Sequence, residues 1–190
     1  MEKQITGQRM GFTKKGLCVV IILMTIVCSI VGFVYIRQFE QTRAMAMQAM
    51  MINVLIGEEL YQVKKGIYTD RWEEVLPYIE QPEILGVQSK AIAGQPQNYF
   101  FGFDKNAIAK QKGYIVSLRI DENKEGGSVQ AVPNKNGFYR YELKQDFPMG
   151  KLQCISQKRA TRFCAKLQEV TEGLELKNLI PVPQKDSAKK

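Results

Sequence analysis

Cys154 and Cys164 are the residues of this chain whose type and spacing best support a specific reaction. Two exported cysteines ten residues apart can form a disulfide, which closes a loop of about eleven residues. A metal site is disfavoured, because two thiolates fall short of the four ligands that zinc takes and the sequence has no histidine. The other two cysteines, Cys18 and Cys28, lie in an uncharged apolar run, where thiols act as small hydrophobic groups. We therefore predict a Cys154–Cys164 disulfide, conditional on export.

Catalytic chemistry of other kinds has little support in the residues. Without histidine no His-dependent triad can form, and no GxxxxGK[ST] or GxGxxG phosphate-binding pattern occurs. Three acidic pairs are the remaining candidates for acid–base work, namely Glu58-Glu59, Glu73-Glu74 and Asp121-Glu122. We interpret all three as solvated positions on helices or turns. We expect no enzymatic activity, no cofactor and no metal.

The element that positions everything else is an apolar run of twenty uncharged residues, 17–36. That length matches the hydrocarbon core of a bilayer, which is about 30 Å thick. A signal peptide would have a shorter apolar region that ends in small residues, whereas this run ends in Val-Tyr-Ile-Arg. Arg9, Lys14 and Lys15 precede the run, so the positive-inside tendency favours a cytoplasmic N-terminus and an exported remainder. The run predicts a single-pass membrane anchor.

The polar stretch that follows, residues 37–65, has no proline and is rich in good helix formers. Its apolar residues recur at helical spacing, and we interpret its methionines as packing residues rather than metal ligands. We predict one continuous helix over about residues 13–65, whose first half is apolar all round and whose second half is amphipathic. Gly66 follows Lys64 and Lys65 and is expected to end it.

The rest of the chain predicts an α+β head. A short helix is expected over 71–78, a loop over 80–97 and a second short helix over 161–169. Four segments rich in β-branched or aromatic residues predict a roughly four-stranded antiparallel meander: 98–104, 114–121, 128–132 and 138–144. Polar turns separate them, including Asn136-Gly137. We expect the amphipathic half of the long helix to cover one face of this sheet.

The exported part is long enough for one ordinary domain. Of the net charge of +8, the residues after Ile36 carry +5, from 23 basic and 18 acidic side chains. No Arg/Lys run is interleaved with aromatic residues, so solubility explains this charge better than DNA or surface binding, which is allowed but unsupported.

In this arrangement the chain resembles the type IV pilins and the pseudopilins of type II secretion systems. Gly11-Phe12-Thr13 resembles the junction where a prepilin peptidase cuts after the glycine and methylates the new N-terminal phenylalanine. The apolar run ends at the twenty-fifth residue counted from Phe12, as in such pilins. Residues 59–79 resemble the end of the pilin spine helix and the turn after it, and the late Cys154–Cys164 pair resembles the pilin disulfide loop.

One departure from the family concerns assembly. Pilins usually carry a glutamate at the fifth position after the cut, where it neutralises the N-terminal amine of a neighbouring subunit. Here that position is Gly16, and Lys14 and Lys15 stand directly before it. Unpaired ammonium groups resist burial in a low-dielectric fibre core and prefer the headgroup region. This pattern suits a minor or divergent subunit better than a major one.

Together these features predict a leader (1–11), a transmembrane and assembly helix (12–36), an amphipathic half (37–66), a globular head (67–180) and a disordered tail (181–190). The resemblance implies a structural subunit in the inner membrane, N-terminus in the cytoplasm and head in the periplasm or outside. Its partners would be prepilin peptidase, membrane lipid and other pilin subunits in a helical fibre. The alternative is an uncleaved, membrane-anchored binding module that holds a ligand on its aromatic-rich sheet (Tyr99, Phe100, Phe101, Phe103, Phe138, Tyr139 and Tyr141).

Overall fold

The computed structural model describes residues 14–79, 86–134, 141–148, 150–156 and 162–172. By its internal contacts the chain divides into two compact units, residues 1–39 and 40–190. Four predicted features lie outside the described residues: the leader, the Gly11-Phe12 junction, the Asn136-Gly137 turn and the tail from residue 181.

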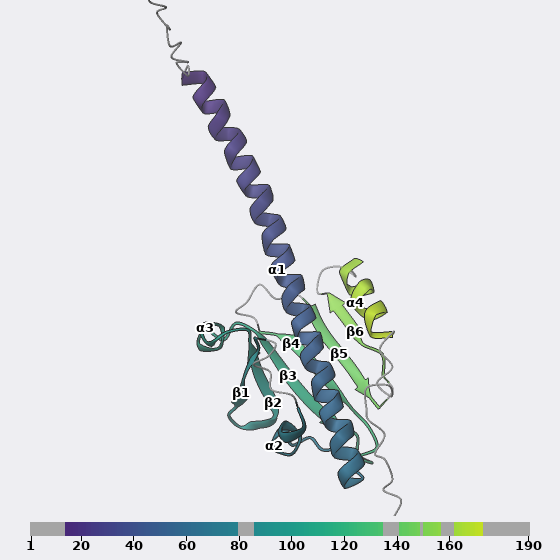
Figure 1. Cartoon of the computed structure of the whole chain (residues 1–190). Helices are drawn as coiled ribbons and strands as arrows, with labels where there is room; N and C mark the ends of the chain where they lie inside the picture. The colour runs from purple at the N-terminus through teal and green to yellow at the C-terminus, as the bar shows by residue number, and fades with distance from the viewer. Residues whose placement is uncertain (1–13, 80–85, 135–140, 149, 157–161, 173–190) are drawn as a thin grey trace, which may run out of the picture. The chain divides into compact units, whose positions relative to one another are not determined.

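The long helix is present as α1, Lys14–Lys65, which has 52 residues and nearly the predicted bounds (Figure 1). It ends where Gly66 takes a φ of +81°, a conformation that suits glycine, and the Gly66 N–H donates to the Gln62 carbonyl at 2.7 Å. Lys64 and Lys65 occupy its last turn, where their charge is favourable beside the negative end of the helix dipole.

In the first unit, the described structure is the part of α1 that covers residues 14–39, and its apolar side chains are exposed. Its most apolar stretch has a mean hydropathy of 3.0 and is not buried against any of the residues that the structure describes. By length and composition this helix can cross a membrane. An exposed apolar surface of this kind is typical of a site that contacts a membrane or another protein.

In the second unit, a six-stranded antiparallel sheet has the order β1-β2-β3-β4-β5-β6. The strands are β1 Gln88–Ile92, β2 Gln95–Gly102, β3 Tyr114–Ile120, β4 Gly127–Pro133, β5 Tyr141–Phe147 and β6 Gln153–Ser156. The prediction of about four strands was therefore too low. The four predicted strands correspond to β2–β5, and the sheet gains β1, inside the expected loop 80–97, and β6 at the other edge.

The core lies between this sheet and the second half of α1, whose ribbon crosses one sheet face in Figure 1. Residues on β3, β4 and β5 alternate between buried and part-exposed positions, as expected for a sheet covered on one face. The helix residues that meet them are fully buried: Met47, Met50, Met51, Val54 and Leu55. The methionines that were interpreted as packing residues are confirmed in that role at these three positions, whereas Met45 is exposed.

Short helices complete the head. The predicted helix over 71–78 is present as α2 (Trp72–Val75) followed by the 3-10 turn η1 (Leu76–Tyr78), which contains Pro77. The predicted C-terminal helix is α4, Arg162–Glu172. The sequence did not predict α3, Lys105–Ala109, which the Asp104 side chain caps by accepting from the Ala107 N–H at 2.6 Å.

Candidate functional site

The first candidate site is the exposed apolar surface of α1. From Leu17 to Ile36 its large hydrophobic side chains are 42–68% exposed. Lys14 and Lys15 are exposed at its start, and Gly16, the position that lacks the expected carboxylate, is part-buried beside them. Cys18 and Cys28 are free thiols on the same surface. The first half of α1 is therefore an apolar helix with positive charge at its N-terminal end.

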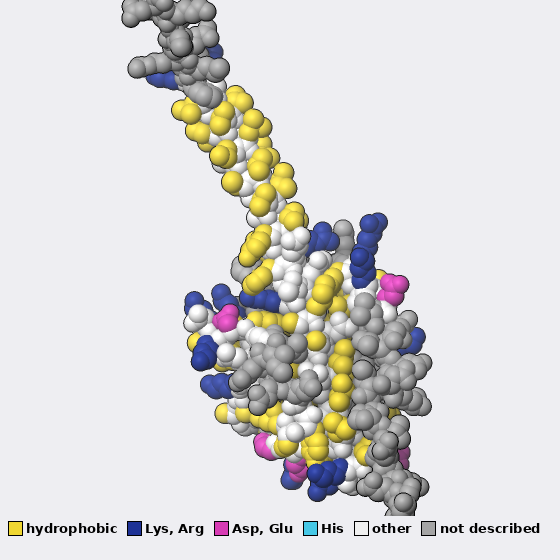
Figure 2. Space-filling model, in the orientation of Figure 1, with side chains coloured by type: hydrophobic (Ala, Val, Ile, Leu, Met, Phe, Trp, Pro, Cys, Tyr) yellow, Lys and Arg dark blue, Asp and Glu magenta, His cyan; other side chains and the backbone are white. Residues whose placement is uncertain are grey.

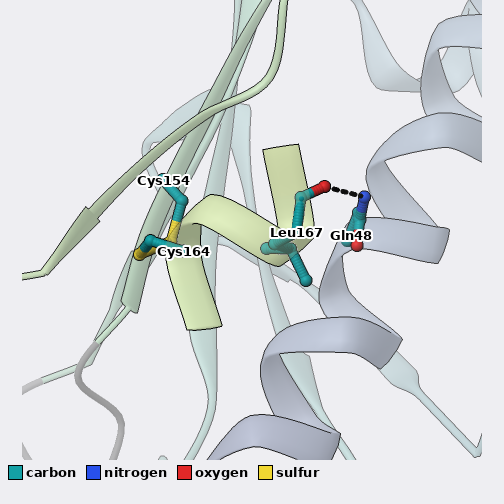
Figure 3. Close-up of a disulfide and its surroundings, with 4 residues drawn as sticks. All are labelled: Gln48, Cys154, Cys164 and Leu167. Atoms are coloured by element: carbon teal, nitrogen blue, oxygen red, sulfur yellow. Dashed lines mark hydrogen bonds between the residues drawn. A yellow bond between two sulfur atoms is a disulfide. The ribbon is translucent and has the colours of Figure 1, made fainter. Parts of the chain in front are cut away.

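The predicted disulfide is present: Cys154 and Cys164 are bonded at 2.07 Å, with Cα atoms 5.3 Å apart. It joins β6 to α4 (Figure 3). On α4, the Phe163 ring packs 4.9 Å from the ring of Tyr141, and the Leu167 carbonyl accepts a 3.3 Å hydrogen bond from the buried amide of Gln48 on α1. The disulfide thus holds in place the helix that covers this side of α1.

The acidic pairs do not all lie where the sequence placed them. Glu73, Asp121 and Glu122 are exposed as predicted. Glu58 is fully buried in α1, so its interpretation as a solvated position was wrong. Helical periodicity gives the reason, because residue 58 lies four residues after Val54 and three before Tyr61, on the face that meets the core. The helical spacing therefore predicts burial of this position, whereas the charge of the residue predicts exposure.

Carboxylates tie the end of α1 to the turn and helix that follow. Glu58 Oε2 accepts from the Thr69 backbone N–H at 3.4 Å, and Glu59 accepts from the Tyr68 hydroxyl at 2.9 Å. Tyr61 donates its hydroxyl hydrogen bond to Glu74 on α2. These three contacts, which sequence reasoning missed, fix the course of the chain around Gly66.

The ionisation of this cluster follows from its surroundings. Burial raises the pKa of Glu58 to about 8, opposed by the Thr69 hydrogen bond and assisted by the nearby negative charges of Asp70, Glu59 and Glu74. The other oxygen of Glu58, Oε1, is buried without a hydrogen-bond partner. The hydrogen bond from Tyr61 lowers the pKa of Glu74, and burial followed by the bond to Glu59 raises the pKa of Tyr68.

An open groove of about 510 Å³ lies beside this cluster, within the head. Its walls come from the end of α1, the turn after it, α2 and the β3–β4 turn. The lining residues are Tyr61, Ile67, Tyr68, Thr69, Asp70, Arg71, Glu74, Ile120, Asp121, Glu122 and Lys124. Among the described residues there is no group of three or more His, Cys, Asp or Glu side chains placed to hold a metal ion.

The aromatic residues of the sheet are part of the core rather than an open ligand surface. Phe100, Phe101 and Tyr141 are buried, and Tyr99 packs its ring 4.9 Å from the ring of Trp72. Phe103 lies under the Arg43 guanidinium, 5.4 Å from its ring centre. Phe138 and Tyr139 are outside the described residues. The aromatic ligand surface of the alternative function is therefore not open at the positions described.

In comparisons with known proteins, no family model, no characterised sequence and no solved structure matches this chain.

Proposed function

We propose that this chain is a pilin-like structural subunit, minor or divergent, of a type IV pilus or a type II secretion pseudopilus. The observation that carries the proposal is the change of surface along α1. Its apolar stretch before Ile36 is unburied, whereas its residues from Ala44 to Tyr61 build the core of an α+β head. One element thus provides both an anchor for a bilayer and a helix for side-by-side packing in a fibre.

Assembly in this proposal requires no catalytic step by the subunit. The membrane supplies anchored subunits, apolar helix surfaces exchange lipid for neighbouring helices, and the heads project outward. Contacts between unlike surfaces of successive copies generate an open helical filament when the rotation between copies does not close a ring. Lys14 and Lys15 disfavour deep burial of the helix start, because an unpaired charge in a low-dielectric interior costs several kcal/mol. A position with fewer helices around it tolerates this cost best.

The test is mass spectrometry of the mature N-terminus, made on the full chain from membranes and from fibres sheared off the cells. We expect a chain that begins at methylated Phe12 and is present in the sheared fraction. An intact Met1 found in the membrane fraction alone contradicts the proposal and supports the anchored binding module instead. Replacing Gly11 is the matched variant: it should leave the chain uncut and remove it from the sheared fraction.

A further inference from the structure

The groove at the end of α1 is acidic in a chain that is basic. Four carboxylates line it (Asp70, Glu74, Asp121 and Glu122) against two cations, Arg71 and Lys124. The whole chain has a net charge of +8. A local excess of negative charge on a basic protein attracts cationic groups, including those of a second copy.

The shape of the groove suits a long cationic side chain. Ile67, which is 43% exposed, offers alkyl surface to an aliphatic stem, while the exposed carboxylates of Asp70 and Glu122 can meet a charged end. Lysine and arginine bind in this divided manner, with the stem against apolar atoms and the charge beside acceptors. A simple metal ion fits less well, since the described carboxylates are not clustered as metal ligands.

A basic surface of this kind is present around α3. Lys105, Lys110 and Lys112 are exposed on α3 and the turn that follows it, and we call them the α3 lysines. Figure 2 shows basic side chains gathered at the edge of the head where Figure 1 places α3. The acid beside them, Asp104, already accepts the helix-capping hydrogen bond from Ala107. The α3 lysines therefore form a basic surface on the head.

The groove and the α3 lysines lie near opposite ends of the α1 half that crosses the sheet. Arg43 of α1 lies over Phe103, which directly precedes Asp104, whereas Tyr61 lines the groove. Tyr61 lies eighteen positions after Arg43, which at 1.5 Å per residue is roughly 27 Å along the helix. A lysine side chain cannot bridge that separation, so the lysines of one head cannot fill its own groove.

We propose that the groove of one copy of this chain receives the α3 lysines of the next copy. The two surfaces differ and lie near different ends of the head, so the contact is heterologous, the type that an open filament requires. This inference rests on the proposed function and names the head-to-head contact that would set the register of the fibre.

The experiment is zero-length carbodiimide cross-linking of the full chain in membranes and sheared fibres, with isotopically light and heavy copies mixed. Mass spectrometry then identifies peptides joined between copies. We expect intermolecular links between Lys105, Lys110 or Lys112 and the acidic groove residues. The paired change Lys105→Glu and Lys110→Glu removes two of the three amines and should lower the links of the remaining Lys112 to the groove by roughly ten-fold, because like charges then face each other.

Two further variants decide the outcome. Adding Asp70→Lys and Glu122→Lys to the lysine changes reverses both surfaces and should restore intermolecular association. The control Arg162→Glu with Lys166→Glu makes the same charge change at exposed positions on α4 and should leave the links unchanged. Fibres that form without the link, or no recovery in the reversed variant, overturn the inference and leave the proposed function standing. Loss of fibres in every variant, with an uncut N-terminus, overturns both.

Discussion

Glu58 Oε2 accepts a 3.4 Å hydrogen bond from the backbone N–H of Thr69, and both residues are buried where α1 meets the turn after it. The bond joins the last part of the long helix to a residue eleven positions further on, across Gly66. A carboxylate without any cationic partner nearby is costly to keep charged in such a site. It is best accommodated as the neutral acid, which explains why burial raises its pKa to about 8.

The first prediction is that the head loses stability as pH rises from 5 to 8. In that window the folded protein holds the Glu58 proton and the unfolded chain, with an ordinary carboxyl pKa of 4.5, does not. The free energy of unfolding should fall by at most about 1.4 kcal/mol per pH unit from this group, and level off above pH 8. Urea titration of the full chain in detergent micelles, followed by fluorescence of the single, buried Trp72, measures it.

Glu58→Gln is the matched variant for this slope, because glutamine keeps the size and cannot ionise. It should flatten the dependence between pH 5 and 8, while Glu73→Gln, at an exposed neighbour, should keep it. A Glu58→Gln protein with the wild-type slope would show that another group causes the pH dependence.

The second prediction concerns the disulfide. Replacing Cys154 and Cys164 together by serine should lower the free energy of unfolding by roughly 2–4 kcal/mol, because the unfolded chain regains the freedom of the open loop. The same denaturation assay measures the loss. Replacing Cys18 and Cys28, the free thiols of α1, should leave head stability unchanged. An equal loss in both double variants would contradict the role given to the bridge.

The third prediction is that Gly57→Ala destabilises the head although alanine favours helices. A Cβ at this position would lie 2.8 Å from Cγ1 of Ile79 and 3.2 Å from Cγ1 of Val75, so these buried side chains must shift. The higher helix propensity of alanine stabilises the folded state by about 1 kcal/mol, whereas overpacking a core destabilises it by about 1–3 kcal/mol. We expect a net loss of stability in the urea assay.

Gly32→Ala is the control for that change. A Cβ at Gly32 has nothing within 4 Å, so the added methyl meets no atom of the chain and head stability should be unchanged. Equal effects at Gly32 and Gly57 would remove the close approach as the cause.

The sequence predicted those elements whose local pattern and tertiary surroundings agree. The long helix follows from composition and from Gly66, and β3 and β4 follow from alternation between polar turns. β1 could not be seen, because Gln88–Ile92 is largely polar and lies among glycines and prolines that read as loop. β6 has four residues and forms by pairing with β5, so its own sequence does not identify it as a strand.

The site was predicted unevenly for similar physical reasons. The apolar run and the Cys154–Cys164 pair are local features, which can be recognised from the length of the run and the spacing of the cysteines. The groove is not local, since Asp70, Glu74 and Glu122 come from three separate segments that only the folded sheet brings together. Glu58 was misplaced because its charge was given more weight than its position on the helix.

The unbroken strand order of the sheet also bears on how the head is made. A ribosome delivers the chain N-terminus first, and every strand after β1 finds its partner in the strand synthesised just before it. Apart from β1, each strand therefore has a partner available as soon as it is made, so few unpaired strand edges are exposed to other nascent chains. The disulfide that joins α4 to β6 can form only after α4 has been synthesised.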